Sequence, residues 1–193
     1  MRAGRIMRVI AGFAKGRKLD APSGYLTRPI TDMIKGALFN VLGAEIEGAF
    51  FLDLFAGSGS VGVEALSRGA ERVYFVDQSR TAVKTIKENI QKCKLDAGSS
   101  VFMMDAFKAL DLFKRRGEKF DYIYVDPPFT NEKIFSQIMA KLGENGLLSD
   151  EGIIVIRSPK NKELSQSFDN LIQYRYSSYG ESSLYYYHST ERS

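Results

Sequence analysis

Four consecutive residues, Asp126-Pro127-Pro128-Phe129, carry the clearest chemical signal in the sequence. They follow the apolar run 122–125, a predicted buried strand, so they fall where a parallel strand meets a ligand crevice. Asp126 could accept an N–H from the exocyclic amine of a nucleobase and draw that conjugated nitrogen toward tetrahedral geometry. The prolines fix φ and lack N–H donors, so they predict a stiff turn whose carbonyls are free to accept the amine's other proton. Phe129 offers a flat face on which a flipped-out base can stack. The tetrapeptide therefore predicts methylation of a base amine. A plain proline turn that closes the strand would have the same sequence.

A glycine-rich loop predicts a second site, one for a cofactor. Gly57, Gly59 and Gly62 follow a predicted strand over 50–54 with the spacing of a dinucleotide-binding loop, and Asp77 lies 20 residues beyond Gly57. Glycines at a strand-to-helix turn let a ligand approach the backbone closely, and an acid after the next strand can bind ribose hydroxyls. NAD and S-adenosylmethionine both contain an adenosine, and a tight structural turn has the same spacing. The loop by itself therefore selects no cofactor.

The acids at the predicted strand ends favour S-adenosylmethionine over NAD. Asp53 stands directly before the glycine loop, where a carboxylate would repel a pyrophosphate but attract the ammonium of a methionyl group. After the third strand, Asp105 could accept the adenine amine and Phe107 could cover its ring, although Asp105 is equally suited to cap a helix. Acids at successive strand ends open on one crevice. The expected cofactor-binding residues are Asp53, Phe55, Gly57, Gly59, Asp77, Asp105 and Ala106.

The apolar pattern alternates between strands and helices from residue 50 onward. Strands are expected at 50–54, 72–76, 100–104, 120–125 and 152–156. Helices are expected between them, at 61–68, 80–95, 106–116 and 131–142. Two last strands, 171–177 and 183–188, have the pattern of an antiparallel hairpin. The predicted fold class is α/β: a Rossmann-like, mostly parallel sheet with helices on both faces and an antiparallel C-terminal edge hairpin.

Two local signals add detail to this outline. Thr31 is the expected N-cap of a helix whose apolar stripe runs to Leu42, and Gly43 is expected to end that helix. The three tyrosines at 185–187 are expected to pack as part of an edge strand rather than to form a contact surface.

A basic segment precedes the α/β region. Residues 1–35 contain eight basic and two acidic residues, a net charge of +6, whereas the whole chain has +4. The charges alternate with apolar residues and glycines, which predicts a two-stranded β-hairpin rather than a tail. We expect a basic arm at 1–24, a methyltransferase-like domain at 25–193 and a polyanionic partner. The expected RNA contacts of the arm are Arg8, Lys15, Arg17 and Lys18.

The composition excludes several classes of protein. A chain of 193 residues with 44% hydrophobic residues can bury a core, and no stretch approaches the length of a membrane span. The N-terminal arginines precede no apolar block, so no secretory signal is expected. One Cys and one His permit neither an intrachain disulfide nor a Cys/His metal cluster, so we expect a cytoplasmic protein without a metal.

With these residues in place, the chain resembles the bacterial 16S rRNA guanine-N2 methyltransferase family (RsmD-type). The segments that carry the resemblance are 8–12 with 16–19, Arg28-Pro29-Ile30-Thr31-Asp32 with 38–40, 53–59 and 126–129. The resemblance implies S-adenosylmethionine as cofactor, ribosomal RNA within the small subunit as partner, and catalysis at 126–129. It also implies that Arg28 and Thr31 line the site on the RNA side.

Other functions remain open from the residues alone. A DNA adenine-N6 or cytosine-N4 methyltransferase would use the same turn, although this chain has little sequence to spare for reading a DNA site. Protein-amide methylation is more often associated with Asn at the position of Asp126. An NAD-dependent oxidoreductase is disfavoured by Asp53, and a binding module without chemistry is disfavoured by the intact turn at 126–129.

Overall fold

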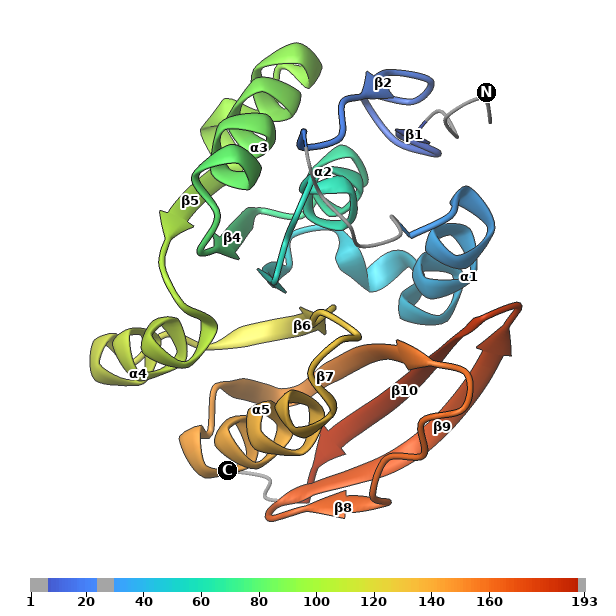
Figure 1. Ribbon diagram of the computed structural model, residues 1–193. Coiled ribbons are helices and arrows are strands. Elements are labelled where there is room, and N and C mark those ends of the chain that lie inside the picture. The colour runs from blue at the N-terminus through green and yellow to red at the C-terminus, as the bar shows by residue number, and fades with distance from the viewer. Residues whose placement is uncertain (1–6, 24–29, 191–193) are drawn as a thin grey trace.

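The computed structural model describes residues 7–23 and 30–190 and has one large sheet with helices on both faces (Figure 1). The sheet has eight strands in the order β5-β4-β3-β6-β7-β10-β9-β8. Their bounds are β3 Phe50–Leu54, β4 Arg72–Asp77, β5 Ser99–Met103, β6 Phe120–Val125, β7 Leu148–Pro159, β8 Ser167–Phe168, β9 Leu171–Tyr179 and β10 Ser182–Ser189. The five strands β5, β4, β3, β6 and β7 pair in parallel. Strands β10, β9 and β8 continue the sheet in antiparallel pairs. The predicted fold class is confirmed.

The described residues contain five α-helices, of which the first precedes the large sheet and the other four separate its strands. The five helices are α1 Asp32–Leu42, α2 Ser60–Ser67, α3 Arg80–Cys93, α4 Ala106–Arg116 and α5 Glu132–Asn145, with 3₁₀ turns at Gly43–Ile46 and Asp96–Gly98. Helices α1, α2 and α3 lie on one side of the sheet in Figure 1, and α4 and α5 lie on the other. The two faces of the sheet have separate hydrophobic cores, and successive residues of a strand point to opposite faces. Phe51 lies in the core beneath α1, α2 and α3, here called the first core, and Leu52 lies in the second core, beneath α4 and α5. This explains why the central strands are apolar throughout.

The ends of α1 follow the sequence prediction. Thr31 has extended backbone geometry, and its hydroxyl accepts a hydrogen bond from the Ile34 N–H at 3.3 Å. Gly43 follows the last helical residue with φ 74°, a conformation that suits glycine. Thr31 is therefore an N-cap, as expected.

The C-terminal part of the sheet differs from the prediction in two ways. The expectation that 185–187 belongs to an edge strand is wrong, because β10 lies between β7 and β9. Tyr186 and Tyr187 are 0% exposed and contribute to opposite cores. The edge is instead the two-residue strand β8, which was not predicted, and such a short edge offers few unpaired backbone groups to another chain.

The predicted N-terminal hairpin is present, with β1 (Met7–Arg8) and β2 (Lys18–Leu19) paired antiparallel. It is packed tightly against the domain, because Met7, Val9 and Leu19 are buried in the first core. The division of the chain at residue 24 stays a prediction.

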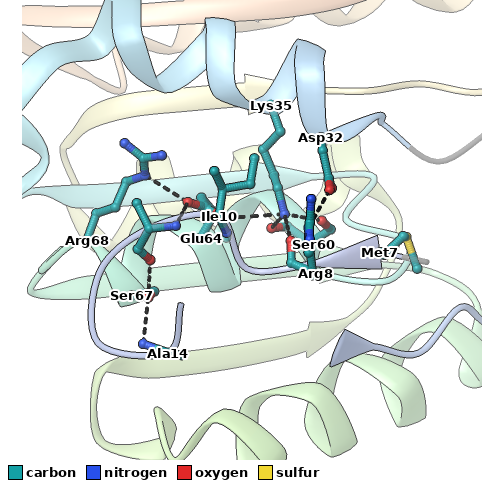
Figure 2. Close-up of polar contacts among 12 residues, drawn as sticks. Met7, Arg8, Ile10, Ala14, Asp32, Lys35, Ser60, Glu64, Ser67 and Arg68 are labelled. Atoms are coloured by element: carbon teal, nitrogen blue, oxygen red, sulfur yellow. Dashed lines mark hydrogen bonds and ion pairs between the residues drawn. The ribbon is translucent and has the colours of Figure 1, made fainter. Parts of the chain in front are cut away.

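A buried carboxylate fastens this hairpin to α2 (Figure 2). Glu64 is 0% exposed, and its two oxygens accept hydrogen bonds from the Ile10 and Ala11 N–H groups at 2.7 and 3.0 Å. The Lys35 ammonium lies 3.3 Å from Glu64 and donates to the Arg8 carbonyl at 2.7 Å. One buried ion pair thus joins the hairpin, α1 and α2. The Arg68 guanidinium also lies 2.9 Å from Glu64, so the carboxylate has two cationic partners. Removing Glu64 would leave the buried Lys35 without an ion-pair partner, so the pair favours one docking geometry.

Candidate active site

Four carboxylates gather at one edge of the sheet. Asp53 and Asp77 lie at the ends of β3 and β4, Asp105 lies two residues after β5, and Asp126 directly follows β6. These strands are neighbours in the order β5-β4-β3-β6 and run parallel, so their carboxyl ends open on the same side. The expected convergence of Asp53, Asp77 and Asp105 at successive strand ends is therefore present in the fold, and Asp126 lies at the same edge.

Asp77 holds the glycine loop against the end of β4. Its Oδ2 accepts a hydrogen bond from the Gly57 N–H at 2.9 Å, and its Oδ1 accepts one from the Ser79 N–H at 2.8 Å. The loop begins at Phe55, which has φ 59°, and Gly59 has φ 72°. A left-handed backbone is strained for a phenylalanine, and such strain is concentrated at ligand sites.

Asp53 lies beneath the start of α2. It is 1% exposed, and its Oδ2 accepts a hydrogen bond from the Gly62 N–H at 2.9 Å. Burial raises the pKa of its carboxyl well above the ordinary value; the Gly62 hydrogen bond opposes this, and the charges of Asp126 and Asp77 raise the pKa further. Among the described residues, Asp53 Oδ1 has no hydrogen-bond partner. A cation beside Asp53 would therefore stabilise its charged form.

The third glycine of the loop serves packing rather than ligand approach. A Cβ atom on Gly62 would lie 2.3 Å from Cε1 of Phe75 on β4, so only glycine lets α2 lie this close to the sheet. This is the role expected of the last glycine in such a loop.

Asp105 is the N-cap of α4. Its Oδ1 accepts hydrogen bonds from the Phe107 and Lys108 N–H groups at 3.0 and 3.2 Å. The capping alternative for this residue is thus realised, and a role toward adenine stays a prediction. Ala106, the first residue of α4, is 4% exposed at the same strand end.

Asp126 begins the turn after β6 and forms a partly buried ion pair. Its N–H donates to the Leu54 carbonyl at 3.2 Å, which fixes the turn to β3. Its Oδ2 lies 2.7 Å from Arg157 Nη1 and accepts a longer hydrogen bond from the Tyr124 hydroxyl at 3.4 Å. Burial raises the pKa of Asp126, and Arg157 opposes that rise. The contacts with Arg157 and Tyr124 are both to Oδ2, and Oδ1 has no partner among the described residues.

Arg157 is the site residue that the sequence analysis missed. It lies on β7, is 4% exposed, and its guanidinium carbon is 5.2 Å from the centroid of the Phe129 ring. It therefore contacts both Asp126 and Phe129 and lies over one face of the ring. A signal was available: an arginine directly after the apolar run 152–156 has few reasons to be buried unless a carboxylate faces it.

The proline turn corrects one detail of the prediction. The carbonyls of both prolines were expected to be free, but Pro128 O accepts a hydrogen bond from the Asn131 N–H at 3.3 Å, which leads into α5. Pro127 O makes no hydrogen bond with a described residue. Pro127 is therefore the proline whose carbonyl is placed to accept a second proton of an amine. Phe129 is half-buried, with its ring centroid 6.2 Å from that of Phe135.

The candidate RNA contacts fall into three groups. Arg8 is exposed but ion-paired with Asp32 at 2.9 Å. The hydroxyl of Thr31 caps α1, and Arg28 lies outside the described residues. The remaining cations are exposed side chains of the hairpin that form no ion pair with any described residue: Lys15, Arg17 and Lys18.

Residues 7–23 and 30–190 contain neither a metal cluster nor a membrane-spanning helix. No group of three or more His, Cys, Asp or Glu side chains is arranged to hold a metal ion there. No helix in these residues is long and apolar enough to cross a bilayer.

Comparison with known proteins identifies the family. The model of the family described as "Conserved hypothetical protein 95" matches residues 7–188. The chain is 36% identical to ribosomal RNA small subunit methyltransferase D of Haemophilus influenzae over 82% of this chain and 81% of that protein. The chain belongs to the family that this model describes. It is also 34% identical to the Escherichia coli protein of the same name, over 79% of this chain and 74% of that one.

Solved structures share the fold along nearly the whole length of this family member. A Thermus thermophilus protein described as hypothetical has a TM-score of 0.82 and 29% identity, covering 94% of this chain and 98% of that one. The family resemblance drawn from segments 8–19, 28–40, 53–59 and 126–129 is thus confirmed. The matched region includes the N-terminal hairpin, so the hairpin is part of what defines the family.

Proposed function

We propose that this protein transfers a methyl group from S-adenosylmethionine to the exocyclic N2 amine of a guanine in small-subunit ribosomal RNA, in the cytoplasm. The observation that carries the proposal is the grouping of Asp126, Arg157 and Phe129 beside a glycine loop lined by buried acids. The names of the relatives support ribosomal RNA as the substrate. The choice of guanine N2 rests on the resemblance to the RsmD-type family.

The acid-lined loop has the donors and acceptors that S-adenosylmethionine needs. When bound, this cofactor supplies an electrophilic methyl group on a sulfonium. Asp53, whose carboxyl pKa is raised by burial, attracts the methionyl ammonium, which relieves its buried charge. Each carboxylate oxygen of Asp77 can accept more than one hydrogen bond, so Asp77 can bind ribose hydroxyls while it holds the Gly57 amide. Asp105 and Ala106 follow β5 at the same sheet edge, a position that supports a role in binding the adenine.

Asp126 prepares the amine for attack. The lone pair of an exocyclic amine is conjugated with the base, so the nitrogen becomes nucleophilic only when its geometry is pulled toward tetrahedral. Asp126 Oδ1 and the Pro127 carbonyl each accept one N–H, which orients the lone pair out of the ring plane. Arg157 occupies the other oxygen of Asp126 and keeps the carboxylate ionised despite its burial. After transfer the acidic N–H proton leaves through Asp126.

Phe129 positions the target base, and the basic hairpin positions the RNA strand that carries it. The partly exposed Phe129 ring stacks the flipped-out guanine, and the cations Lys15, Arg17 and Lys18 bind phosphates of the surrounding RNA. We expect assembled or partly assembled small subunits to be better substrates than naked RNA. Folded ribosomal RNA within a particle presents already unstacked bases, and a base of that kind costs least to flip.

The test is incubation with labelled S-adenosylmethionine and, separately, small ribosomal subunits, protein-free 16S rRNA, and duplex DNA. Nucleosides from the labelled product are then identified by mass spectrometry. N2-methylguanosine from the subunits is the expected product. N6-methyladenosine as the main product would overturn the guanine assignment but keep the amine chemistry. Labelling of DNA alone would overturn the RNA substrate.

A further inference from the structure

The most exposed large apolar side chain in the described part of the chain is Phe13, at the turn of the N-terminal hairpin. It is 90% exposed, whereas Met7, Val9, Ala14 and Leu19 of the same hairpin are buried. A phenylalanine in water is unfavourable by about 25 cal/mol for each Å² of apolar surface left uncovered. A single exposed apolar side chain is common on protein surfaces, so a partner for Phe13 has to be inferred from what surrounds this ring.

The backbone around Phe13 is held rigidly by the end of α2. The Phe13 N–H donates to the Ser67 carbonyl at 2.7 Å, and the Ala14 N–H donates to the Ser67 hydroxyl at 2.9 Å, a contact drawn in Figure 2. The same hydroxyl donates to the Ala11 carbonyl at 2.6 Å. A Cβ atom on Gly12 would lie 1.6 Å from the Ser67 carbonyl oxygen, so the turn is seated directly on the helix. A ring on such a support loses little freedom when a partner binds.

The chemistry around Phe13 is cationic. Lys15, Arg17 and Lys18 follow it in the same hairpin, are exposed, and form no ion pair with any described residue. An exposed aromatic ring among unpaired cations is complementary to a single-stranded nucleic acid, which presents a flat base and a phosphate at every step. An apolar protein partner would not call for those charges.

We propose that Phe13 is a base-stacking residue that holds an unpaired nucleotide of the RNA at a second point, apart from the base that is methylated. The inference rests on the proposed function in taking RNA as the partner. Phe13 contacts the end of α2 at Ser67, whereas Gly62, at the start of α2, contacts Asp53 of the cofactor site. Ser67 and Gly62 lie five residues apart along α2, a rise of about 7.5 Å. Phe13 therefore lies toward the other end of α2 from the cofactor site, and in this arrangement Phe13 and Phe129 contact different nucleotides.

A tryptophan at this position tests the stacking directly. The chain contains no tryptophan, so Phe13→Trp introduces a single tryptophan, whose emission can be excited selectively over that of the ten tyrosines. Oligoadenylate, a single-stranded RNA with strongly stacking bases, is the probe, and inorganic polyphosphate is the control with charge but without bases. We expect oligoadenylate to quench the Phe13→Trp emission and polyphosphate to leave it nearly unchanged.

Affinity measurements separate stacking from charge. Phe13→Ala should weaken oligoadenylate binding about 5- to 150-fold, the range of one stacked base, with an unchanged salt slope. Phe13→Tyr should bind like the parent because it keeps the ring. The matched control Lys15→Ala should reduce the salt slope and leave the quenching of a Phe13→Trp background intact. The binding of S-adenosylmethionine should be the same in all of these variants.

The outcomes distinguish this inference from the proposed function. Parent-like oligoadenylate binding by Phe13→Ala, or an unquenched Phe13→Trp, overturns the stacking role even if ribosomal RNA is methylated. Weaker binding of Phe13→Ala to small subunits with unchanged binding to oligoadenylate also overturns it, since the ring would then contact a ribosomal protein. If the parent methylates no RNA, the proposed function fails, while quenching in the same protein still supports stacking.

Discussion

Replacing Arg157 with Met should both destabilise the protein and shift the pH dependence of its activity. The guanidinium is the charged partner 2.7 Å from Asp126, and the two side chains are 5% and 21% exposed. Losing one member of a buried ion pair costs about 3–5 kcal/mol of unfolding free energy, because the other charge stays buried without compensation. Methionine fills a similar volume, so little of this loss should come from a cavity.

The sign of the pH effect follows from the direction of the pKa shift. Burial already raises the pKa of Asp126, and the neighbouring Arg157 charge does most to lower it, so Arg157→Met raises it further. A carboxyl whose pKa is higher in the folded than in the unfolded state favours the folded state as pH falls. The variant should therefore lose more stability at pH 8 than at pH 5. The rise of kcat/KM with pH should move to higher pH, because only the ionised form of Asp126 can accept the proton of the substrate amine.

Urea denaturation at several pH values and a pH profile of single-turnover methylation are the assays. The double variant Arg157→Met with Asp126→Asn removes both charges and should recover part of the lost stability without recovering activity. Arg157→Lys keeps a charge but not the planar contact with Phe129, so its pH profile should lie between those of the parent and Arg157→Met. A parent-like pH profile in Arg157→Met would refute the view that Arg157 keeps Asp126 ionised.

Three further changes address separate parts of the site. Asp126→Ala should leave cofactor affinity by calorimetry nearly unchanged and lower turnover by roughly 10²–10³, the scale for one preorganised polar group at the reacting centre; near-normal turnover would contradict the amine-orienting role. Asp77→Ala should weaken S-adenosylmethionine binding because the ribose loses an acceptor and the glycine loop loses its anchor; unchanged calorimetric affinity would exclude it from the cofactor site. The triple alanine variant at Lys15, Arg17 and Lys18 should make RNA binding less sensitive to salt. The slope of log K against log salt concentration should fall by about 0.7–0.9 for each phosphate that the hairpin no longer neutralises. An unchanged slope would show that the hairpin is not part of the RNA interface. This triple variant is a sharper test than truncation of the hairpin, which would also expose the buried Glu64.

Local sequence rules were sufficient to predict the helices and strands and to predict the edge of the sheet at which the acidic residues meet. The helix 106–116 begins after a capping Asp105 and ends before Gly117, whose φ of 66° suits glycine, and both signals are readable in the sequence. The alternation of strands with helices requires parallel pairing. Parallel pairing brings every strand end, and hence Asp53, Asp77 and Asp126, to one side. The site could be outlined from the sequence because topology alone determines which ends converge.

Which side chains meet within that outline depends on the packing of elements that are distant in the sequence. Arg157 pairs with Asp126 from 31 residues away because Val125 is in register with Ile156, and a one-residue slip would turn the arginine to the other face. The docking of the hairpin depends in the same way on Glu64, a helical acid that would pass for a surface residue and is in fact 0% exposed. Pairings of this kind depend on strand register and on how elements pack, and neither is encoded in the spacing of neighbouring residues. The sequence by itself determined the chemistry of the groups and the edge of the sheet that holds them, and the packing determined their partners.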